Sequence, residues 1–399
     1  MKNSILALIL ILLSGSAQNR RSNNSIETID IYNAFNAKKT ITLSSIVQSV
    51  EYIPLETRSD VVLTTGFIYQ ITNEHIIAFN NNGKTVQILM FERKSGKYIK
   101  EIAKAGRGPN EYRNPVRDCF NIYNKVIYAN GNNRDIISYN LDGKYLESFK
   151  LPELDDPAIK GGKRFVFFST YLKDDVFVYY VPNTSGFEKR KIILFSRDSI
   201  IKEYPNYLSW ERKNLNVSYG FGNSCDFFRF DNSLFFKELL NDTVFQVTKE
   251  KLDPLFVFSA GKLSFPYSKR EEFNTSDKYQ KCLVVSRLMG NSGFLFFELF
   301  CDEKRYFSFY DKKMKRTTIS DTPDASLAAI VDDINGFMPL SPQQLTPNNE
   351  MVFYLEAGKI KKWIDANPSK AKSLWGKFPW LKNITEMDNP VIVIAKCKG

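Results

Sequence analysis

The chain has 399 residues, of which 43% are hydrophobic and 25% charged, and its formal net charge is +11. This balance excludes an intrinsically disordered protein and predicts a body with a buried core. Lys and Arg are scattered without a long cationic run, so we expect a solvated basic surface and no nucleic-acid partner.

Residues 1–17 have the features of a secretory signal peptide. Lys2 precedes an apolar run over residues 5–13, and small residues follow up to Ala17. The run is too short to span a bilayer and no later stretch is longer, so we expect no transmembrane segment. Ser16 stands where a bacterial lipobox needs Cys, so we expect no lipid anchor. The sequence predicts an exported protein of the periplasm or cell surface.

The polar, Asn- and Ser-rich stretch 18–40 predicts a flexible leader, and residues 41–399 form the body. In the body, residues 74–99 and 125–146 align end to end as strand, turn, strand and Gly-Lys turn. This spacing of short strands is typical of a propeller blade. The 32 Phe and 20 Tyr residues also favour sheet.

Weaker copies of the same pattern begin near residues 175, 233, 294 and 351. The sequence therefore predicts an all-β fold, a six-bladed β-propeller. An extended segment at residues 49–55 precedes the first unit, and the chain ends in another at 390–395. We expect these two to pair, so that the N-terminal strand closes the last blade and leaves few free sheet edges.

The last blade carries an insertion at about residues 356–383. Ile360, Trp363 and Ile364 have helical spacing, and Asn367-Pro368 interrupts it, which predicts two short helices. The five Cys residues form no metal-binding motif, and we expect most of them to be small buried side chains. A Cys282–Cys301 disulfide is conceivable but not expected.

Four stretches resemble a known family. They are S-I-V-Q-S-V-E-Y-I-P-L-E-T at 45–57, G-R-G-P-N-E-Y at 106–112, N-D-T-V-F at 241–245 and D-N-P-V at 388–391. Together they resemble the uncharacterised, NHL-like six-bladed β-propellers exported by many bacteria, which are typically lipoproteins. The resemblance covers nearly the whole mature chain. It implies the fold and the export route, and it implies no reaction.

The G-R-G-P-N-E-Y stretch has two interpretations. It lacks the G-K-[ST] ending of a phosphate loop, so Gly106, Gly108 and Pro109 favour a structural crossover between blades one and two. In that interpretation Arg107 and Glu111 form a buried ion pair.

In the other interpretation the same stretch binds a ligand at the central channel or on one face of the ring. The candidate ligand-binding residues are Arg107, Glu111, Tyr112 and Arg117.

No catalytic centre is evident. His75 is the single histidine, which excludes a multi-histidine metal site. Adjacent residues on a strand point to opposite faces, so neither acidic pair, 155–156 or 332–333, can form an acid/base couple there. On loops, these carboxylates could help to bind calcium. Trp210, Trp363, Trp375 and Trp380 are candidates for stacking on sugars, and Trp363 fits a core position equally well.

Two functional hypotheses follow. The favoured one is a monomeric binding module of the cell envelope, without catalysis or cofactor, that binds a glycan, a peptide or an envelope protein. The alternative is a calcium-assisted propeller hydrolase or lyase that acts on a saccharide or lactone. A purely structural module, with an exposed apolar patch, is a third interpretation.

Overall fold

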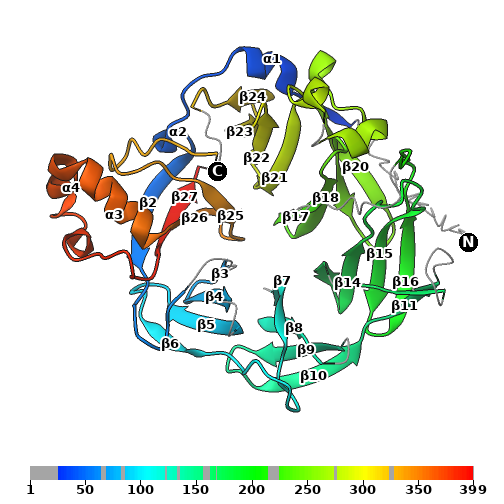
Figure 1. Ribbon diagram of the computed structural model, residues 1–399, viewed down its shortest axis with the longest axis horizontal. Coiled ribbons are helices and arrows are strands. Elements are labelled where there is room, and N and C mark those ends of the chain that lie inside the picture. Colours follow the sequence, from blue (N-terminus) through cyan, green and yellow to red (C-terminus); the bar gives the residue numbers. More distant parts are fainter. Residues whose placement is uncertain are drawn as a thin grey trace, which may run out of the picture.

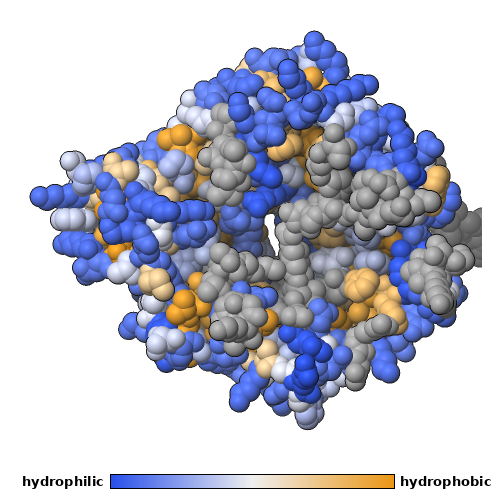
Figure 2. Space-filling model, viewed as in Figure 1, coloured by the Kyte–Doolittle hydropathy of each residue, from blue (hydrophilic) through white to orange (hydrophobic). Residues whose placement is uncertain are grey.

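The computed structural model describes residues 26–63, 69–81, 86–121, 124–132, 135–155, 162–167, 169–213, 224–273, 276–322 and 328–398. Within these ranges six sheets surround a central axis, each beginning near the axis and running outward (Figure 1). A narrow opening follows the axis in the space-filling view (Figure 2). The predicted six-bladed, all-β propeller is confirmed.

The first three blades are four-stranded antiparallel sheets. The first contains β3 (Tyr69–Ile71), β4 (His75–Asn81), β5 (Val86–Glu92) and β6 (Tyr98–Glu101). The second contains β7 (Asn114–Asn121), β8 (Val126–Asn130), β9 (Asp135–Asn140) and β10 (Tyr145–Lys150). The third contains β13 (Thr170–Lys173), β14 (Val176–Tyr180), β15 (Arg190–Ser196) and β16 (Ser199–Pro205). A hairpin of β11 (Glu153–Asp155) and β12 (Lys163–Phe165) connects blades two and three.

The last three blades extend this pattern. The fourth contains β17 (Cys225–Phe230), β18 (Ser233–Glu238), β19 (Thr243–Val247), β20 (Leu252–Ser259) and, outermost, β1 (Glu27–Asp30). The fifth contains β21 (Val284–Gly290), β22 (Phe294–Cys301), β23 (Lys304–Asp311) and β24 (Arg316–Ile319). The sixth contains β25 (Pro342–Leu345), β26 (Glu350–Leu355), β27 (Val391–Cys397) and, outermost, β2 (Val47–Pro54).

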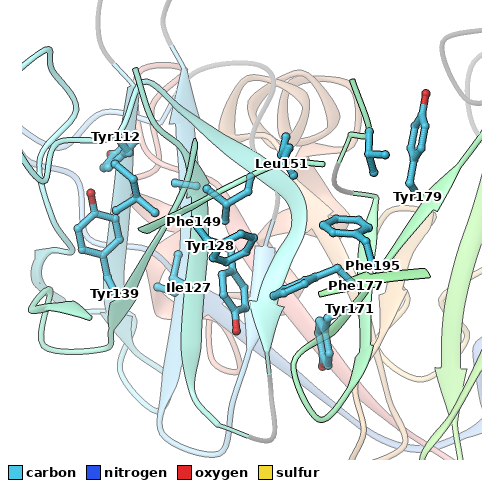
Figure 3. Packing of buried hydrophobic residues seen from close by; sticks show 14 of the residues in the cluster. Tyr112, Ile127, Tyr128, Tyr139, Phe149, Leu151, Tyr171, Phe177, Tyr179 and Phe195 are labelled. Atoms are coloured by element: carbon cyan, nitrogen blue, oxygen red, sulfur yellow. The ribbon is translucent and has the colours of Figure 1, made fainter. Parts of the chain in front are cut away.

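The core lies between neighbouring blades. Middle strands such as β14 are buried along their whole length, because each sheet packs against a neighbour on both faces. The outer strand β16 is mostly exposed, including the side chains of Ile200 and Ile201. Figure 3 shows the cluster between blades two and three, where the Phe177 ring lies 5.2 Å from Tyr128 and 5.5 Å from Phe195. Aromatic side chains fill the wedge between blades, which explains their high content in the sequence.

The two faces of the ring differ in their connections. On one face tight turns join the strands, such as Asp174–Asp175 and Asp231–Asn232, whose φ values between 48° and 57° suit two-residue hairpins. The other face carries the long crossovers between blades and the insertion of blade six. We call it the long-connection face, formed by the described residues within 102–113, 151–169, 181–189, 206–224, 260–283, 320–341 and 356–390. Long loops on a rigid scaffold are where binding residues concentrate.

The predicted helical insertion is confirmed. It consists of α3 (Ala357–Ala366), α4 (Pro368–Leu374) and the short 3-10 helix η4 (Pro379–Lys382). Its apolar side packs on blade six through Ile360 and Leu381. In the described part of the chain, no helix has the length and apolarity needed to cross a membrane.

The closure of the ring also follows the prediction. Strand β2 pairs antiparallel with β27, from Val47 opposite Cys397 to Pro54 opposite Val391. Hydrogen bonds between the first and last parts of the chain therefore seal the sixth blade. Breaking this pairing would expose one edge of β2 and one edge of β27.

The flexible leader predicted over residues 18–40 is wrong from residue 26 onward. Strand β1 pairs in parallel with β20, and α1 (Ile31–Asn36) follows with its N-terminus capped by Asp30. The backbone N–H of Lys39 then donates to Ile319 of blade five at 3.0 Å. This strap, residues 27–43, spans blades four, five and six before β2 begins. The polar composition of residues 26–40 concealed the buried side chains of Ile29 and Ile31, and Ile41 and Leu43 are buried at the end of the strap.

Candidate functional site

The G-R-G-P-N-E-Y stretch is a tightly folded crossover between blades one and two. The Glu111 carboxylate accepts a hydrogen bond from the Gly108 backbone N–H at 2.7 Å. A Cβ atom at Gly106 would lie 2.0 Å from Oε2 of Glu111, so only glycine leaves room for the carboxylate. Tyr112 is fully buried and donates from its hydroxyl to the Val86 carbonyl at 3.2 Å.

The expected Arg107–Glu111 ion pair does not form. Glu111 turns back onto its own loop, while the Arg107 side chain is exposed on the long-connection face. A backbone N–H group in a loop needs a hydrogen-bond acceptor, and the Glu111 carboxylate serves as the acceptor for that of Gly108. Arg117 lies in β7, in a stretch whose side chains fall outside the described part. Ligand binding by Arg107, Glu111, Tyr112 and Arg117 stays a prediction.

We expect Gly106→Ala to lower the free energy of unfolding by about 1–2 kcal/mol, because it displaces the Glu111 carboxylate from a charge-assisted hydrogen bond. Guanidinium denaturation followed by tryptophan fluorescence measures the loss. In a Glu111→Ala background the same substitution should cost much less, since the clash is gone. Arg107→Ala is the matched control and should change stability by less than about 0.5 kcal/mol. Equal costs of Gly106→Ala in both backgrounds would contradict this role of Glu111.

The acidic pairs stabilise loops in the structure. Asp332 accepts a hydrogen bond from the Tyr52 hydroxyl at 2.7 Å and another from the Asn335 backbone N–H at 2.9 Å. Asp333 accepts instead from the Ser44 backbone N–H at 2.8 Å. Asp155 is exposed and pairs with Lys163, and Asp156 lies outside the described residues. Among the described residues, no three His, Cys, Asp or Glu side chains gather as metal ligands.

The tryptophans occupy packed positions. Trp210 is buried, and its indole N–H donates to the Asn183 carbonyl at 2.8 Å. Trp363 and Trp380 contact the ring of Phe337 at centroid distances of 4.7 and 6.3 Å. Trp375 is half-buried in the same cluster. Trp210 is therefore a core residue and offers no stacking surface, while the other three are only partly covered.

A different group of aromatic residues is exposed on the long-connection face. Phe167, Phe187 and Tyr207 have 59%, 62% and 87% of their surface exposed. They come from three different loops, which precede β13, connect β14 to β15 and follow β16. Since β13 begins, β14 ends, β15 begins and β16 ends at the same edge of blade three, these loops meet there. Figure 2 shows an apolar area in the sector that blade three occupies in Figure 1.

An ion-pair cluster joins the segment before β13 to the loop between β14 and β15. Glu188 binds Arg164 at 2.8 Å through one carboxylate oxygen and Arg190 at 2.9 Å through the other. Burial alone would raise the pKa of Glu188, but the hydrogen bonds from Arg190 and Arg164 outweigh it and hold the pKa below its usual range. Glu188 therefore stays ionised, and the positions of Phe167 and Phe187 are tied together.

Hydrogen bonds fix the loop that follows β16 to the loop between β14 and β15. The Asn206 side-chain amide donates to the Glu188 carbonyl at 3.0 Å, and the Asn206 backbone N–H donates to the Lys189 carbonyl at 2.7 Å. The Trp210 backbone N–H donates to the Gly186 carbonyl at 3.0 Å. Gly186 has a φ of 88°, and a Cβ there would lie 2.0 Å from the Trp210 carbonyl oxygen. These bonds hold Phe187 and Tyr207 on adjoining loops.

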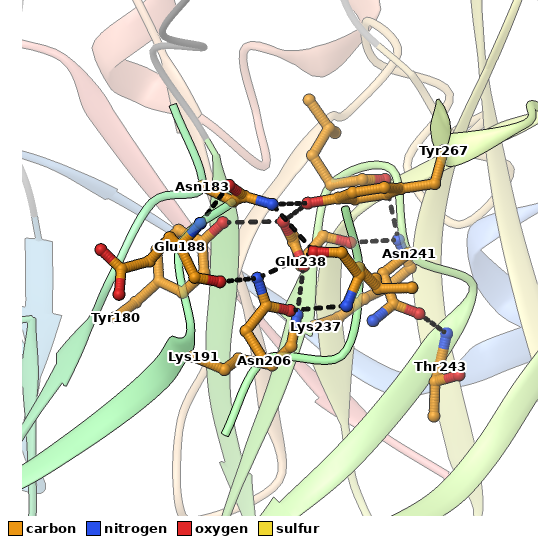
Figure 4. A network of polar contacts seen from close by, with 12 residues as sticks. Tyr180, Asn183, Glu188, Lys191, Asn206, Lys237, Glu238, Asn241, Thr243 and Tyr267 are labelled. Atoms are coloured by element: carbon orange, nitrogen blue, oxygen red, sulfur yellow. Dashed lines mark hydrogen bonds and ion pairs between the residues drawn. The ribbon is translucent and has the colours of Figure 1, made fainter. Parts of the chain in front are cut away.

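Figure 4 shows a buried network of polar contacts around Glu238, close to Glu188 and Asn206 of these loops. Glu238, at the end of β18, accepts hydrogen bonds from Tyr180 at 3.0 Å and Tyr267 at 2.7 Å, and forms ion pairs with Lys191 at 2.5 Å and Arg270 at 3.2 Å. Burial raises the pKa of Tyr180 and Tyr267, so both hydroxyls remain donors. The network joins blade three, through Tyr180 and Lys191, to blade four and the crossover that follows it.

We call the exposed aromatics Phe167, Phe187 and Tyr207, with the Arg164–Glu188–Arg190 cluster, the aromatic corner. Chemically it offers exposed apolar rings beside fixed charges, which is the composition of interface hot spots. Sequence reasoning missed it, although one signal was present. Phe187 and Tyr207 each stand inside a turn-forming stretch rich in Pro, Asn, Ser and Gly, where an apolar ring has no core to enter.

Comparisons with known proteins agree with this fold. A protein of Bacteroides fragilis, named as a proposed exported protein, superposes with a TM-score of 0.65 at 15% identity, covering 94% of this chain and 100% of its own. A member of the DUF4221 family from Bacteroides vulgatus superposes with a TM-score of 0.52 at 12% identity, covering 88% and 97%. No curated protein sequence matches.

One family model matches nearly the whole chain. It is described as "Domain of unknown function (DUF4934)" and spans residues 26–396. This match includes the strap, all six blades and the helical insertion. The chain therefore belongs to the DUF4934 family of uncharacterised proteins.

Proposed function

We propose that this protein is an exported binding module of the cell envelope that recognises a peptide segment or a protein through the aromatic corner. The observation that carries the proposal is the exposure of three aromatic rings over a rigid support. Monomeric proteins rarely expose contiguous large apolar side chains unless these serve an interaction. The support matters equally, because binding residues held in place lose less entropy when a partner binds.

The charges of the aromatic corner add selectivity. Arg164 and Arg190 both pair with Glu188, so charged groups lie fixed beside the exposed rings. A partner segment that carries apolar side chains next to polar groups would match both features. A glycan partner is the weaker candidate, because Phe167 and Phe187 offer no hydrogen-bonding group.

A binding panel tests this proposal. The protein is screened by thermal shift against acidic, basic and apolar peptides and against neutral glycans, since native-state binding raises the melting temperature. For the best peptide, Phe187→Ser with Tyr207→Ser should weaken affinity about a thousandfold, at about 2 kcal/mol per ring. Ile200→Ser with Ile201→Ser, on the exposed outer strand β16, is the matched control and should leave affinity unchanged.

Two outcomes would contradict the proposal. Equal loss of affinity in both double variants would place the binding surface elsewhere. Stabilisation by calcium that a chelator reverses, with no peptide effect, would favour the alternative of a calcium-assisted hydrolase or lyase, and assays on saccharides and lactones would then follow.

A further inference from the structure

The helical insertion of blade six concentrates much of the positive charge of the protein. Residues 357–382 contain seven Lys and a single acidic residue, Asp365, for a formal charge of +6 within a chain of +11. The remaining basic residues are spread among acidic ones over the rest of the chain. The insertion is therefore a distinct basic surface on the long-connection face.

The lysines point outward because the apolar side of the insertion is already occupied. Ile360, Leu374, Phe378 and Leu381 are buried against blade six. Ion pairs engage two of the lysines, Lys359 with Glu356 and Lys361 with Asp365. The other five are exposed, and among the described residues none of them has an acidic partner: Lys362, Lys370, Lys372, Lys377 and Lys382.

Aromatic rings lie between these cations. The Lys370 ammonium lies 5.9 Å from the centroid of the Trp363 ring, and that of Lys382 lies 5.8 Å from the Trp375 ring. Both tryptophans are half-buried, so each presents part of a flat apolar surface beside a positive charge. Lys377 bonds to the side-chain oxygen of Asn335, which fixes it near the same surface.

We propose that the helical insertion binds an acidic polysaccharide. Carboxylates spaced along a polymer would meet the separated ammonium groups, and sugar rings would pack on the exposed tryptophan faces. A bilayer fits less well, because among the described residues of 357–382 no large hydrophobic side chain is exposed for insertion. Nucleic acid fits less well because the surface has no Arg, the residue best suited to bidentate phosphate recognition.

The proposal is tested with defined probes. Binding of the protein is measured by calorimetry to polygalacturonate, to neutral dextran, to vesicles containing anionic lipid and to duplex DNA, at low and high salt. Lys362→Glu with Lys372→Glu removes charge from the insertion. Lys94→Glu with Lys97→Glu makes the same change of net charge in the exposed turn between β5 and β6, on the opposite face. Unchanged denaturation midpoints show that both variants fold.

We expect salt-sensitive binding to polygalacturonate, a loss of at least about tenfold in the insertion variant, and less than about twofold in the control. Dextran, vesicles and DNA should bind more weakly than polygalacturonate. Equal losses in both variants would overturn the proposal, since net charge alone would then explain binding. Tighter binding to vesicles or DNA would overturn the choice of an acidic polysaccharide.

Discussion

Replacing Glu238 with Gln should destabilise the folded protein by about 3–5 kcal/mol, because it leaves the cations of Lys191 and Arg270 buried without their counter-charge. The carboxylate is almost fully buried and joins blade three to the crossover that follows blade four. Guanidinium denaturation at neutral pH measures the loss. Glu147→Gln is the matched control, since Glu147 forms an exposed pair with Arg197 and should cost less than about 1 kcal/mol.

The effect of Glu238→Gln should depend on pH in a defined direction. Burial alone would raise the pKa of Glu238, but the Lys191 charge and hydrogen bond, with Tyr267 and Arg270, hold it below its usual value. A carboxylate with a lowered pKa stabilises the fold above its unfolded-state pKa, and this contribution disappears as pH falls through the folded-state pKa. The difference between wild type and variant should therefore be full at pH 7 and shrink only below about pH 4. A difference that grows in acid would contradict the network.

Replacing Ile31 with Asp should release the strap from the ring. Ile31 is fully buried at the start of α1, and a buried unpaired charge there costs several kcal/mol, so the chain avoids it by detaching β1 and α1. Hydrogen exchange should then accelerate in residues 27–36 and at the newly exposed edge of β20. The β2–β27 pairing should keep its protection, because it closes blade six independently.

A neighbouring position provides the control for the strap. Thr28→Asp introduces the same side chain at an exposed position of β1 and should leave exchange rates nearly unchanged. If Ile31→Asp accelerated exchange uniformly in all blades, the strap would be part of the global folding unit. Unchanged exchange in residues 27–36 would show that the strap does not dock as described.

The fold could be predicted because its signals are local and repeated. Short apolar strands with Gly-Lys turns at Gly96 and Gly143 specify a blade, and six copies specify the ring. The closing strand was evident because residues 49–55 and 390–395 are strong strand signals with no other partner. The first part of the strap was missed because, up to residue 40, Ile29 and Ile31 are its fully buried residues, and two apolar residues in a polar stretch carry no periodic pattern.

The candidate site could not be predicted in the same way. The aromatic corner brings together Phe167, Phe187 and Tyr207 from three loops, and exposure depends on tertiary contacts that no local pattern encodes. The G-R-G-P-N-E-Y motif attracted attention because it is distinctive, yet Glu111 and its glycines satisfy one another within the loop. A distinctive motif in a propeller can therefore reflect the demands of a crossover between blades.

The most direct test of the aromatic corner uses a photo-crosslinking amino acid in the living cell. It is placed at Tyr207, at Phe187 and, as the control, at Ile201 on the exposed outer strand β16. We expect the same discrete peptide-containing adduct from positions 207 and 187 and none from position 201. Adding Phe187→Ser should abolish the adduct from position 207. Adducts of equal yield from all three positions, or from 201 alone, would contradict the claim that the aromatic corner is the binding surface.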